Sequence, residues 1–158
     1  MHSPILETRT LTWPDEAACE RWAQGLARHA GVRDALIELH GTLGAGKTTF
    51  TRHLLRALGV SGRIKSPSYA VVEPHEAPGV RAWHFDFYRF NDPREWEDAG
   101  FRDIFAGPGL KLVEWPEQAG ELLPVPDLRL HIAPIAGSET QRSVRLDACT
   151  PRGQELLS

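Results

Sequence analysis

Three glycines, a lysine and a threonine stand at a spacing that suits the binding of a polyphosphate. Residues 41–48 read GTLGAGKT, which is the pattern Gly-x-x-x-x-Gly-Lys-Thr. Glycines let a backbone turn tightly and present its N–H groups to phosphate oxygens. Lys47 can reach the β- and γ-phosphates, and the Thr48 hydroxyl is suited to ligate Mg²⁺. We therefore predict that a magnesium-bound nucleoside triphosphate binds at this loop. The residues predicted to contact it are Gly41, Thr42, Leu43, Gly44, Ala45, Gly46, Lys47, Thr48 and Thr49.

A first carboxylate suited to metal binding and hydrolysis is Asp86, in the stretch WHFDFYRF. In an extended strand His84, Asp86 and Tyr88 fall on one face, and the aromatic residues between them fall on the other. A carboxylate among aromatic residues is costly to bury without a partner, and Mg²⁺ or its hydration shell would be one. The alternative is an ion pair with Arg81 or Arg89, or an exposed position at a sheet edge.

The second carboxylate is Glu114, in the stretch LKLVEWP. It ends a strand-like segment, and open α/β sheets place their ligand sites at the carboxyl ends of strands. We predict that Asp86 and Glu114 are catalytic and that they ligate the metal together with Thr48; the alternative for Glu114 is a solvated strand end. Trp115 either covers the nucleotide or packs in the core. No residue stands out as an arginine finger, so we expect slow hydrolysis until a partner completes the site.

The elements on either side of the loop are those that a phosphate site requires. Residues 35–39, ALIEL, form a short apolar run that predicts a strand. A helix is predicted from residue 46 or 47 to about 58, because Phe50, Leu54 and Leu58 share one face. Gly59 then suits the position after the helix end. The positive N-terminal end of this helix would point at the phosphates.

The rest of the chain alternates between strand-like and helical patterns. Predicted strands cover 5–11, 68–73, 81–88, 110–115, 127–135 and 143–148, and predicted helices cover about 13–30, with Thr12 as its cap, and 92–100. This alternation predicts a single three-layer α/β domain over residues 1–158, with its core at about 5–150. Its sheet is expected to be mixed and mainly parallel, with flanking helices and an antiparallel C-terminal pair.

Composition restricts the classes of partner. The formal net charge of −3 argues against a domain that grips nucleic acid by itself, although it leaves room for a local basic patch. Cys19 and Cys149 have no metal or disulfide spacing, which is typical of reduced thiols in a cytoplasmic protein. No apolar run reaches the roughly 20 residues of a membrane span, and no signal peptide is evident. We therefore expect no membrane or DNA partner.

Taken together, four stretches resemble the TsaE family, also called YjeE-type proteins. They are GTLGAGKTTF, SPSY at 66–69, HFDFYRF at 84–90 and LVEWPEQ at 112–118, in the family's order and at similar separations. The resemblance covers roughly residues 5–150. It implies a small P-loop ATPase of bacterial tRNA threonylcarbamoyladenosine synthesis, with ATP and Mg²⁺ as cofactors.

The resemblance also implies partners and roles. It predicts that the chain binds the TsaD–TsaB complex, meets tRNA only indirectly through that complex, and resets it by hydrolysing ATP. Lys47 and Thr48 would bind phosphate and metal beside Thr49, Asp86 and Glu114 would serve Mg²⁺ and hydrolysis, and Trp115 would lie near the nucleotide. The 66–69 loop would face the γ-phosphate. Thr42 stands where the family usually has Asp, and Ser68 where it usually has Thr.

Two other functions share the phosphate loop. A small-molecule kinase usually has an arginine-rich lid, whereas segment 89–103 contains five acids beside its three arginines. A nucleotide-gated scaffold would need only binding, because a γ-phosphate can order a docking surface without being hydrolysed.

Overall fold

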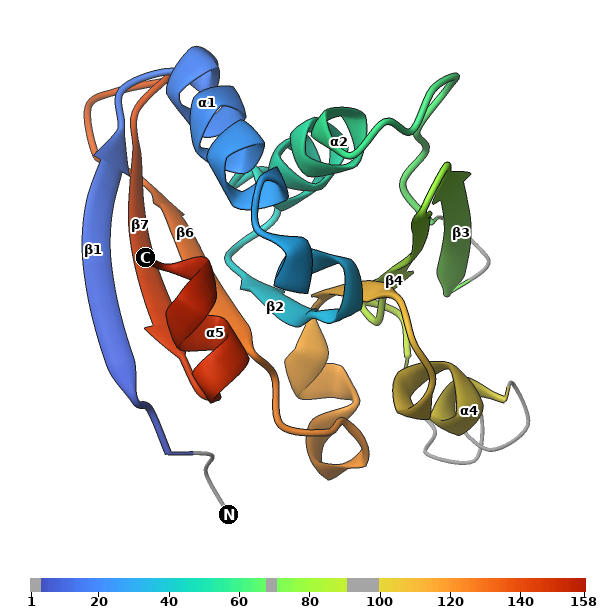
Figure 1. The fold of residues 1–158 in the computed structure, drawn as a ribbon. Helices are drawn as coiled ribbons and strands as arrows, with labels where there is room; N and C mark the ends of the chain where they lie inside the picture. Colours follow the sequence, from blue (N-terminus) through green and yellow to red (C-terminus); the bar gives the residue numbers. More distant parts are fainter. Residues whose placement is uncertain (1–3, 68–70, 91–99) are drawn as a thin grey trace.

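A single mixed sheet forms the centre of the protein in a computed structural model that describes residues 4–67, 71–90 and 100–158. Its strand order is β1-β7-β6-β2-β5-β4-β3 (Figure 1). The strands are β1 (Glu7–Trp13), β2 (Leu36–His40), β3 (Val72–Ala77), β4 (Val80–Asp86), β5 (Leu110–Glu114), β6 (Leu128–Pro134) and β7 (Arg142–Ala148). The four central strands β6, β2, β5 and β4 are parallel, and β1, β7 and β3 add antiparallel edges.

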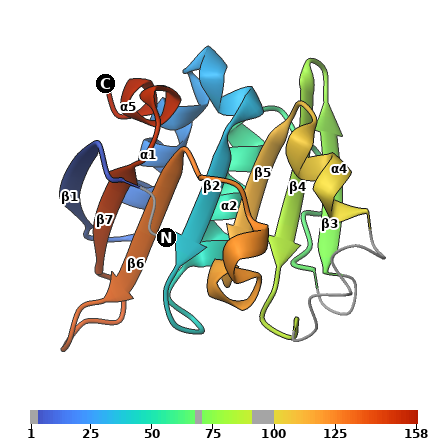
Figure 2. The same ribbon diagram turned by 90° about the horizontal axis from the view of Figure 1, so that it is seen from below.

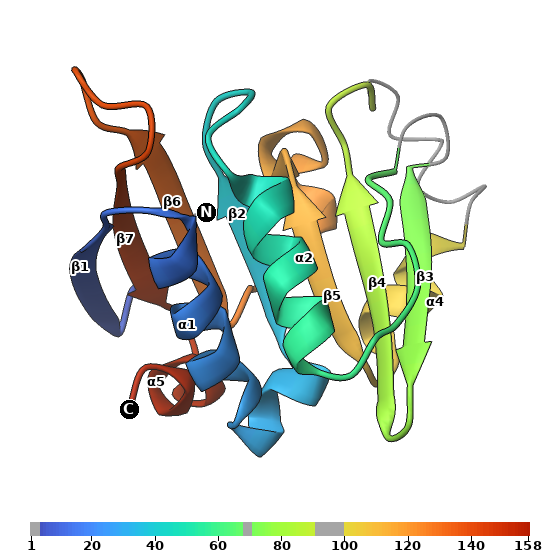
Figure 3. The ribbon, with the colours of Figure 1, turned by 90° about the horizontal axis from the view of Figure 1, so that it is seen from above.

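Helices cover both faces of this sheet. The helices are α1 (Glu16–Ala27), α2 (Lys47–Ala57), α4 (Phe101–Ala106) and α5 (Pro151–Leu156), and the 3₁₀ turns are η1 (Ala30–Asp34), η2 (Pro116–Gln118) and η3 (Gly120–Leu122). Figure 3 shows α1 and α2 in front of the sheet, and Figure 2, from the other side, shows α4 and the turns after β5 in front of it. The three-layer α/β arrangement predicted from the sequence is confirmed.

Two apolar clusters hold these layers together. One lies between the sheet and α1 and α2 and includes Phe50 and Leu112; the other lies on the opposite face and includes Phe85 and Val113. Leu112 and Val113 are consecutive residues, so β5 is buried on both of its faces, as expected of a central parallel strand. Because β5 is packed on both faces, it cannot slide along its axis, and the position of its last residue, Glu114, is fixed.

The predicted elements nearest the glycine loop agree with the structure. β2 and α2 lie within about a residue of the expected ranges, and Gly59 adopts φ +100° just after α2, as predicted for a helix stop. The C-terminal strand pair is antiparallel, as predicted. No helix in the described part of the chain has the length and apolar character needed to cross a bilayer.

The prediction of the first helix was wrong at its start. β1 continues to Trp13, which pairs with Arg142 of β7, and α1 begins only at Glu16. Its cap is Asp15, whose carboxylate accepts the Ala18 N–H at 2.9 Å, and not Thr12. Both residue types cap helices well, so the pairing of β1 with β7 decides between them.

The strand predicted at 68–73 is displaced in the structure, and the helix predicted at 92–100 falls mostly outside the described residues. β3 spans Val72–Ala77, later than the predicted 68–73, and it includes Pro74, which an edge strand tolerates because one row of its N–H groups makes no ladder bond. Residues 68–70 lie outside the described part, as does nearly all of the helix predicted at 92–100. The short helices α4 and α5 were not predicted.

Candidate functional site

The glycine loop joins the carboxyl end of β2 to the first turn of α2. A Cβ on Gly41 would lie 2.5 Å from the carbonyl oxygen of Ile132, so only glycine fits there with the loop in this position. Gly46 stands at the cap position with φ +114°, a left-handed conformation that glycine adopts readily. Because Gly46 has no side chain to cap the helix, the N–H groups of the first turn are open to an anion.

Lys47 is buried at the end of this loop, where it is the first residue of α2. Its Nζ donates to the Gly41 carbonyl oxygen at 2.6 Å and lies 3.8 Å from the centre of the Trp115 ring. Burial lowers the pKa of Lys47, while the carboxylates of Glu114 and Asp86 act in the opposite direction. The ammonium group is thus held beside the loop by a backbone oxygen, an aromatic face and nearby negative charge.

The two predicted acids meet at the ends of adjacent strands. Asp86 of β4 is the register partner of Glu114 of β5, and Glu114 is also opposite Leu39 of β2. Glu114 is 3% exposed, and Thr48 Oγ1 lies 3.1 Å from its Oε2. The structure therefore brings Thr48, Asp86 and Glu114 to one place, although they lie far apart in the sequence.

His84 completes the surroundings of Glu114, and the sequence analysis did not include it among the site residues. Its Nε2 lies 2.5 Å from Glu114 Oε2, and its side chain is 1% exposed. Its Nδ1 is buried without a hydrogen-bond partner among the described residues. The two-residue alternation along WHFDFYRF already placed His84 on the face of Asp86, so the signal was present but its partner on β5 was not visible.

Asp86 is half-buried at the mouth of the site. Burial raises its pKa, and the Tyr88 N–H, which donates to Oδ1 at 2.9 Å, opposes that rise. Arg81, one of the ion-pair partners weighed for this acid, instead lies near Glu76 at 3.8 Å.

Trp115 closes the site with an unusual backbone. Among the described residues it is the one non-glycine residue with positive φ, at +56°. Its indole ring packs beside Tyr88, with ring centres 4.9 Å apart, and over Lys47. A left-handed backbone costs a bulky residue about 1–2 kcal/mol, so the packing around the ring must hold it in place.

These residues surround a cavity of about 220 Å³. Its lining consists of Leu43, Gly44, Gly46, Lys47, Thr48, Thr49, Asp86, Tyr88, Glu114 and Trp115. Of the other predicted loop residues, Gly41 begins the loop directly after β2, and its carbonyl oxygen accepts the Lys47 hydrogen bond. Thr42 is exposed, and its carbonyl oxygen accepts the Ala45 N–H at 3.1 Å.

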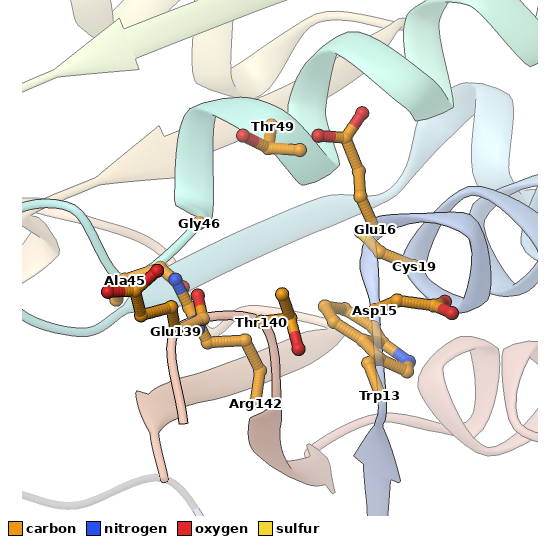
Figure 4. A pocket seen from close by; sticks show the side chains of 10 residues that line it. All are labelled: Trp13, Asp15, Glu16, Cys19, Ala45, Gly46, Thr49, Glu139, Thr140 and Arg142. Carbon is orange, nitrogen blue, oxygen red and sulfur yellow. The ribbon is translucent and has the colours of Figure 1, made fainter. Parts of the chain in front are cut away.

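A second cavity of similar size lies between the first turn of α2, the start of α1 and the β6–β7 hairpin (Figure 4). It is lined by Trp13, Asp15, Glu16, Cys19, Ala45, Gly46, Thr49, Glu139, Thr140 and Arg142. Gly46 and Thr49 line both cavities, so the two lie next to each other at the start of α2. Arg142 Nε donates to the Ala45 carbonyl oxygen at 2.9 Å and so ties the β6–β7 hairpin to the loop. Sequence reasoning missed this cavity because its walls come from three distant segments.

The oxygen atoms in the first cavity fit Mg²⁺ only in combination with a phosphate. Thr48, Asp86 and Glu114 offer a hydroxyl and two carboxylates, the hard oxygen ligands that Mg²⁺ prefers. Among the described residues no group of three or more His, Cys, Asp or Glu side chains could hold a metal by itself. Mg²⁺ commonly binds through one or two carboxylates plus phosphate oxygens and waters, which is the arrangement this cavity allows.

Comparison with known proteins identifies the family of the chain. The family model described as "Threonylcarbamoyl adenosine biosynthesis protein TsaE" matches residues 13–144. The chain is 35% identical over 157 residues to the tRNA threonylcarbamoyladenosine biosynthesis protein TsaE of Haemophilus influenzae, an alignment that covers 97% of this chain and 98% of that protein. The protein of the same name from Bacillus subtilis is 32% identical over 151 residues, covering 96% and 90%.

A solved structure has the same fold as this chain. The crystal structure of Bacillus subtilis YdiB superimposes with a TM-score of 0.73 at 26% identity, covering 98% of this chain and 95% of that one. The α/β P-loop fold thus extends over the sequence that the family model matches. The chain therefore belongs to the TsaE family and has that family's role in tRNA threonylcarbamoyladenosine biosynthesis.

Proposed function

We propose that the chain is the Mg²⁺-dependent ATP-binding and ATP-hydrolysing component of this tRNA modification machinery, and that it acts on a TsaD–TsaB complex to allow its turnover. The observation that carries the proposal is the meeting of Lys47, Thr48, Asp86 and Glu114 around one cavity at the start of α2. The cytoplasmic location expected from the sequence stays a prediction.

In this proposal the two cavities hold different parts of one nucleotide. The open N–H groups of the loop and of the first turn of α2 bind the phosphates, and Lys47 adds its charge after leaving the Gly41 carbonyl oxygen. The second cavity, which shares Gly46 and Thr49 with the first, takes the nucleoside. Charge-assisted hydrogen bonds of this kind are short and strong, so the phosphates fix the position of the nucleotide.

In this proposal Glu114 and Asp86 have different roles, metal binding for the first and orientation of water for the second. Thr48 and Glu114 would hold Mg²⁺, which would supply positive charge to the phosphate site. His84 holds the Glu114 carboxylate in place through Oε2, the oxygen that Thr48 also contacts. Asp86 is less buried than Glu114, and its carboxylate is suited to orient an attacking water. No arginine enters the cavity among its lining residues, which supports slow hydrolysis until the partner complex contributes a group.

The first test is ATP binding by the Lys47→Ala variant. Removing a cation from a triphosphate should weaken binding by a few kcal/mol, because charge-assisted contacts contribute about 1.5–3 kcal/mol each. Isothermal titration calorimetry measures the change, and Arg21→Ala, which removes an exposed cation from α1, serves as the matched control. Unchanged ATP affinity in Lys47→Ala would show that the loop is not the binding site.

The second test separates hydrolysis from binding alone. Phosphate release by the wild-type chain should rise when TsaD and TsaB are added, with no phosphorylated acceptor formed. Glu114→Gln should bind ATP and hydrolyse it much more slowly, and tRNA modification in a reconstituted system should fall in parallel. If modification continues at the wild-type rate while hydrolysis is lost, nucleotide binding and not turnover is the function.

A further inference from the structure

Four exposed cations surround a hollow beside the nucleotide site. The loop after α2 runs back along that helix toward its N-terminal end (Figure 3), where Ser66 Oγ lies 3.4 Å from Thr48 Oγ1. The hollow has a volume of about 560 Å³. We call it the basic hollow; its lining residues are Arg52, Arg56, Arg63, Ile64, Lys65 and Ser66.

The positive charges of the basic hollow have no acidic partner in the part of the chain that the structure describes. None of Arg52, Arg56, Arg63 and Lys65 takes part in an ion pair there. Arg56 donates to the Val60 carbonyl oxygen at 3.0 Å, which positions it without neutralising it. Arg52 and Arg56 are one helical turn apart, a spacing at which like charges destabilise a helix. Such a cluster in a chain of net charge −3 is best explained by an anionic partner.

The lining of the basic hollow favours a phosphate backbone over a protein surface. Its one apolar residue, Ile64, is 8% exposed, so the hollow offers no aromatic or aliphatic anchor of the kind that protein interfaces use. Three of the four cations are arginines, whose planar groups bind phosphate oxygens through two hydrogen bonds. Contacts of this type bind nucleic acid without reading its bases.

We propose that the basic hollow binds the sugar–phosphate backbone of tRNA directly, next to the nucleotide site. The proposal rests on the tRNA role of the family but not on ATP hydrolysis. It replaces the expectation that tRNA is met only through the partner complex. Because four cations act within a chain that is negative overall, binding by the isolated protein is weak and strongly dependent on salt.

The test is fluorescence anisotropy with labelled tRNA at low salt, over a series of KCl concentrations, without nucleotide. The wild-type chain binds, and log K falls linearly with log[KCl]. The Arg52→Ala/Arg56→Ala variant loses about tenfold or more in affinity, and its salt slope falls by about 1.5, which corresponds to two phosphate contacts. The matched control is Arg21→Ala/Arg28→Ala, which removes the same charge from exposed positions on α1 and at its end.

Each outcome of this experiment is decisive. Equal losses in the two double variants would overturn the proposal, because they would mean that only net charge matters. Absence of wild-type binding at low salt, or binding of poly-glutamate in place of tRNA, would also overturn it, and the latter would assign the hollow to an acidic protein surface. Lys47→Ala should keep full tRNA affinity while losing ATP, so failure of this proposal and failure of the ATP site are distinguishable.

Discussion

His84 and Glu114 form a buried pair in which the carboxylate depends on its neighbours. Glu114 is 3% exposed and receives hydrogen bonds from Thr48 and, at 2.5 Å, from His84. A buried carboxylate without enough donors costs far more than one in water. The pair therefore holds a buried acid at the wall of the first cavity.

This dependence predicts a non-additive pair of substitutions. His84→Phe should lower the free energy of unfolding by about 1–3 kcal/mol, because it leaves Glu114 with an unmet hydrogen bond. In the Glu114→Gln background the same substitution should cost less, since the charge has gone. Urea unfolding of the four proteins of this double-mutant cycle measures the coupling. Additive losses would mean that His84 stabilises the fold only through its packing.

At the scale of single residues, the sequence predicted which residues belong to the site better than it predicted the contacts between them. The glycine loop and both acids could be found from residue type and spacing, and the structure places Asp86 and Glu114 beside Lys47. His84 and Arg142 could not be assigned, because their importance comes from partners on other strands. The left-handed backbone of Trp115 was equally hidden, since the residue type gives no sign of it.

Among the elements, α1 and α5 each contain a glycine, but the two glycines have opposite surroundings. A Cβ on Gly25 of α1 would meet nothing within 4 Å, whereas one on Gly153 of α5 would lie 1.9 Å from the Asp127 carbonyl oxygen. Asp127 also accepts the Thr150 hydroxyl at 2.5 Å, and Thr150 in turn caps α5. Gly153 thus lets α5 pack directly on the backbone before β6.

The same substitution should therefore have opposite effects at these two glycines. Gly25→Ala should raise the free energy of unfolding by about 0.5–1 kcal/mol, because alanine restricts the unfolded chain and favours the helix. Gly153→Ala should lower it by about 1–3 kcal/mol, since α5 must move away from Asp127. Chemical denaturation of both variants measures the difference. A neutral Gly153→Ala would show that α5 shifts without cost.

Elements near the site were predicted better than elements at the edges. β2, α2 and β5 have strong local signals, because apolar runs and a helical apolar face both point to the same core. The start of α1 could not be predicted, since Thr12 and Asp15 are both good caps and only the β1–β7 ladder excludes the first. α5 contains Pro151 and Gly153 and gives almost no helical signal, because tertiary packing determines it.

For the molecule as a whole, two histidines predict how stability depends on pH. Burial lowers the pKa of His75, with a further contribution from His84, and burial and His40 lower that of His131. The unfolded chain therefore binds protons at a higher pH than the folded protein does. This stabilisation of the fold is present above the ordinary histidine pKa of about 6.5 and is lost as pH falls below it.

We expect the free energy of unfolding to decrease between about pH 7.5 and 5.5 for this reason. His75→Gln and His131→Gln should each flatten the decrease, because each removes one group whose protonation favours the unfolded chain. Thermal or urea unfolding across this pH range measures the slope. A stability that is constant over the range, or slopes unchanged in both variants, would contradict the assignment.

The parallel pairing of β2, β5 and β4 also has a consequence for the order of events during synthesis. Thr48 and Glu114 are 66 positions apart, and β5 lies between β2 and β4 although it follows both in the chain. A nascent polypeptide whose residue 114 is still inside the ribosome has the glycine loop but lacks the strand that completes its pocket. If the proposed site binds a nucleotide, capture must wait until β5 has emerged and paired with β2 and β4, and a bound nucleotide would mark a chain whose central strands are in place.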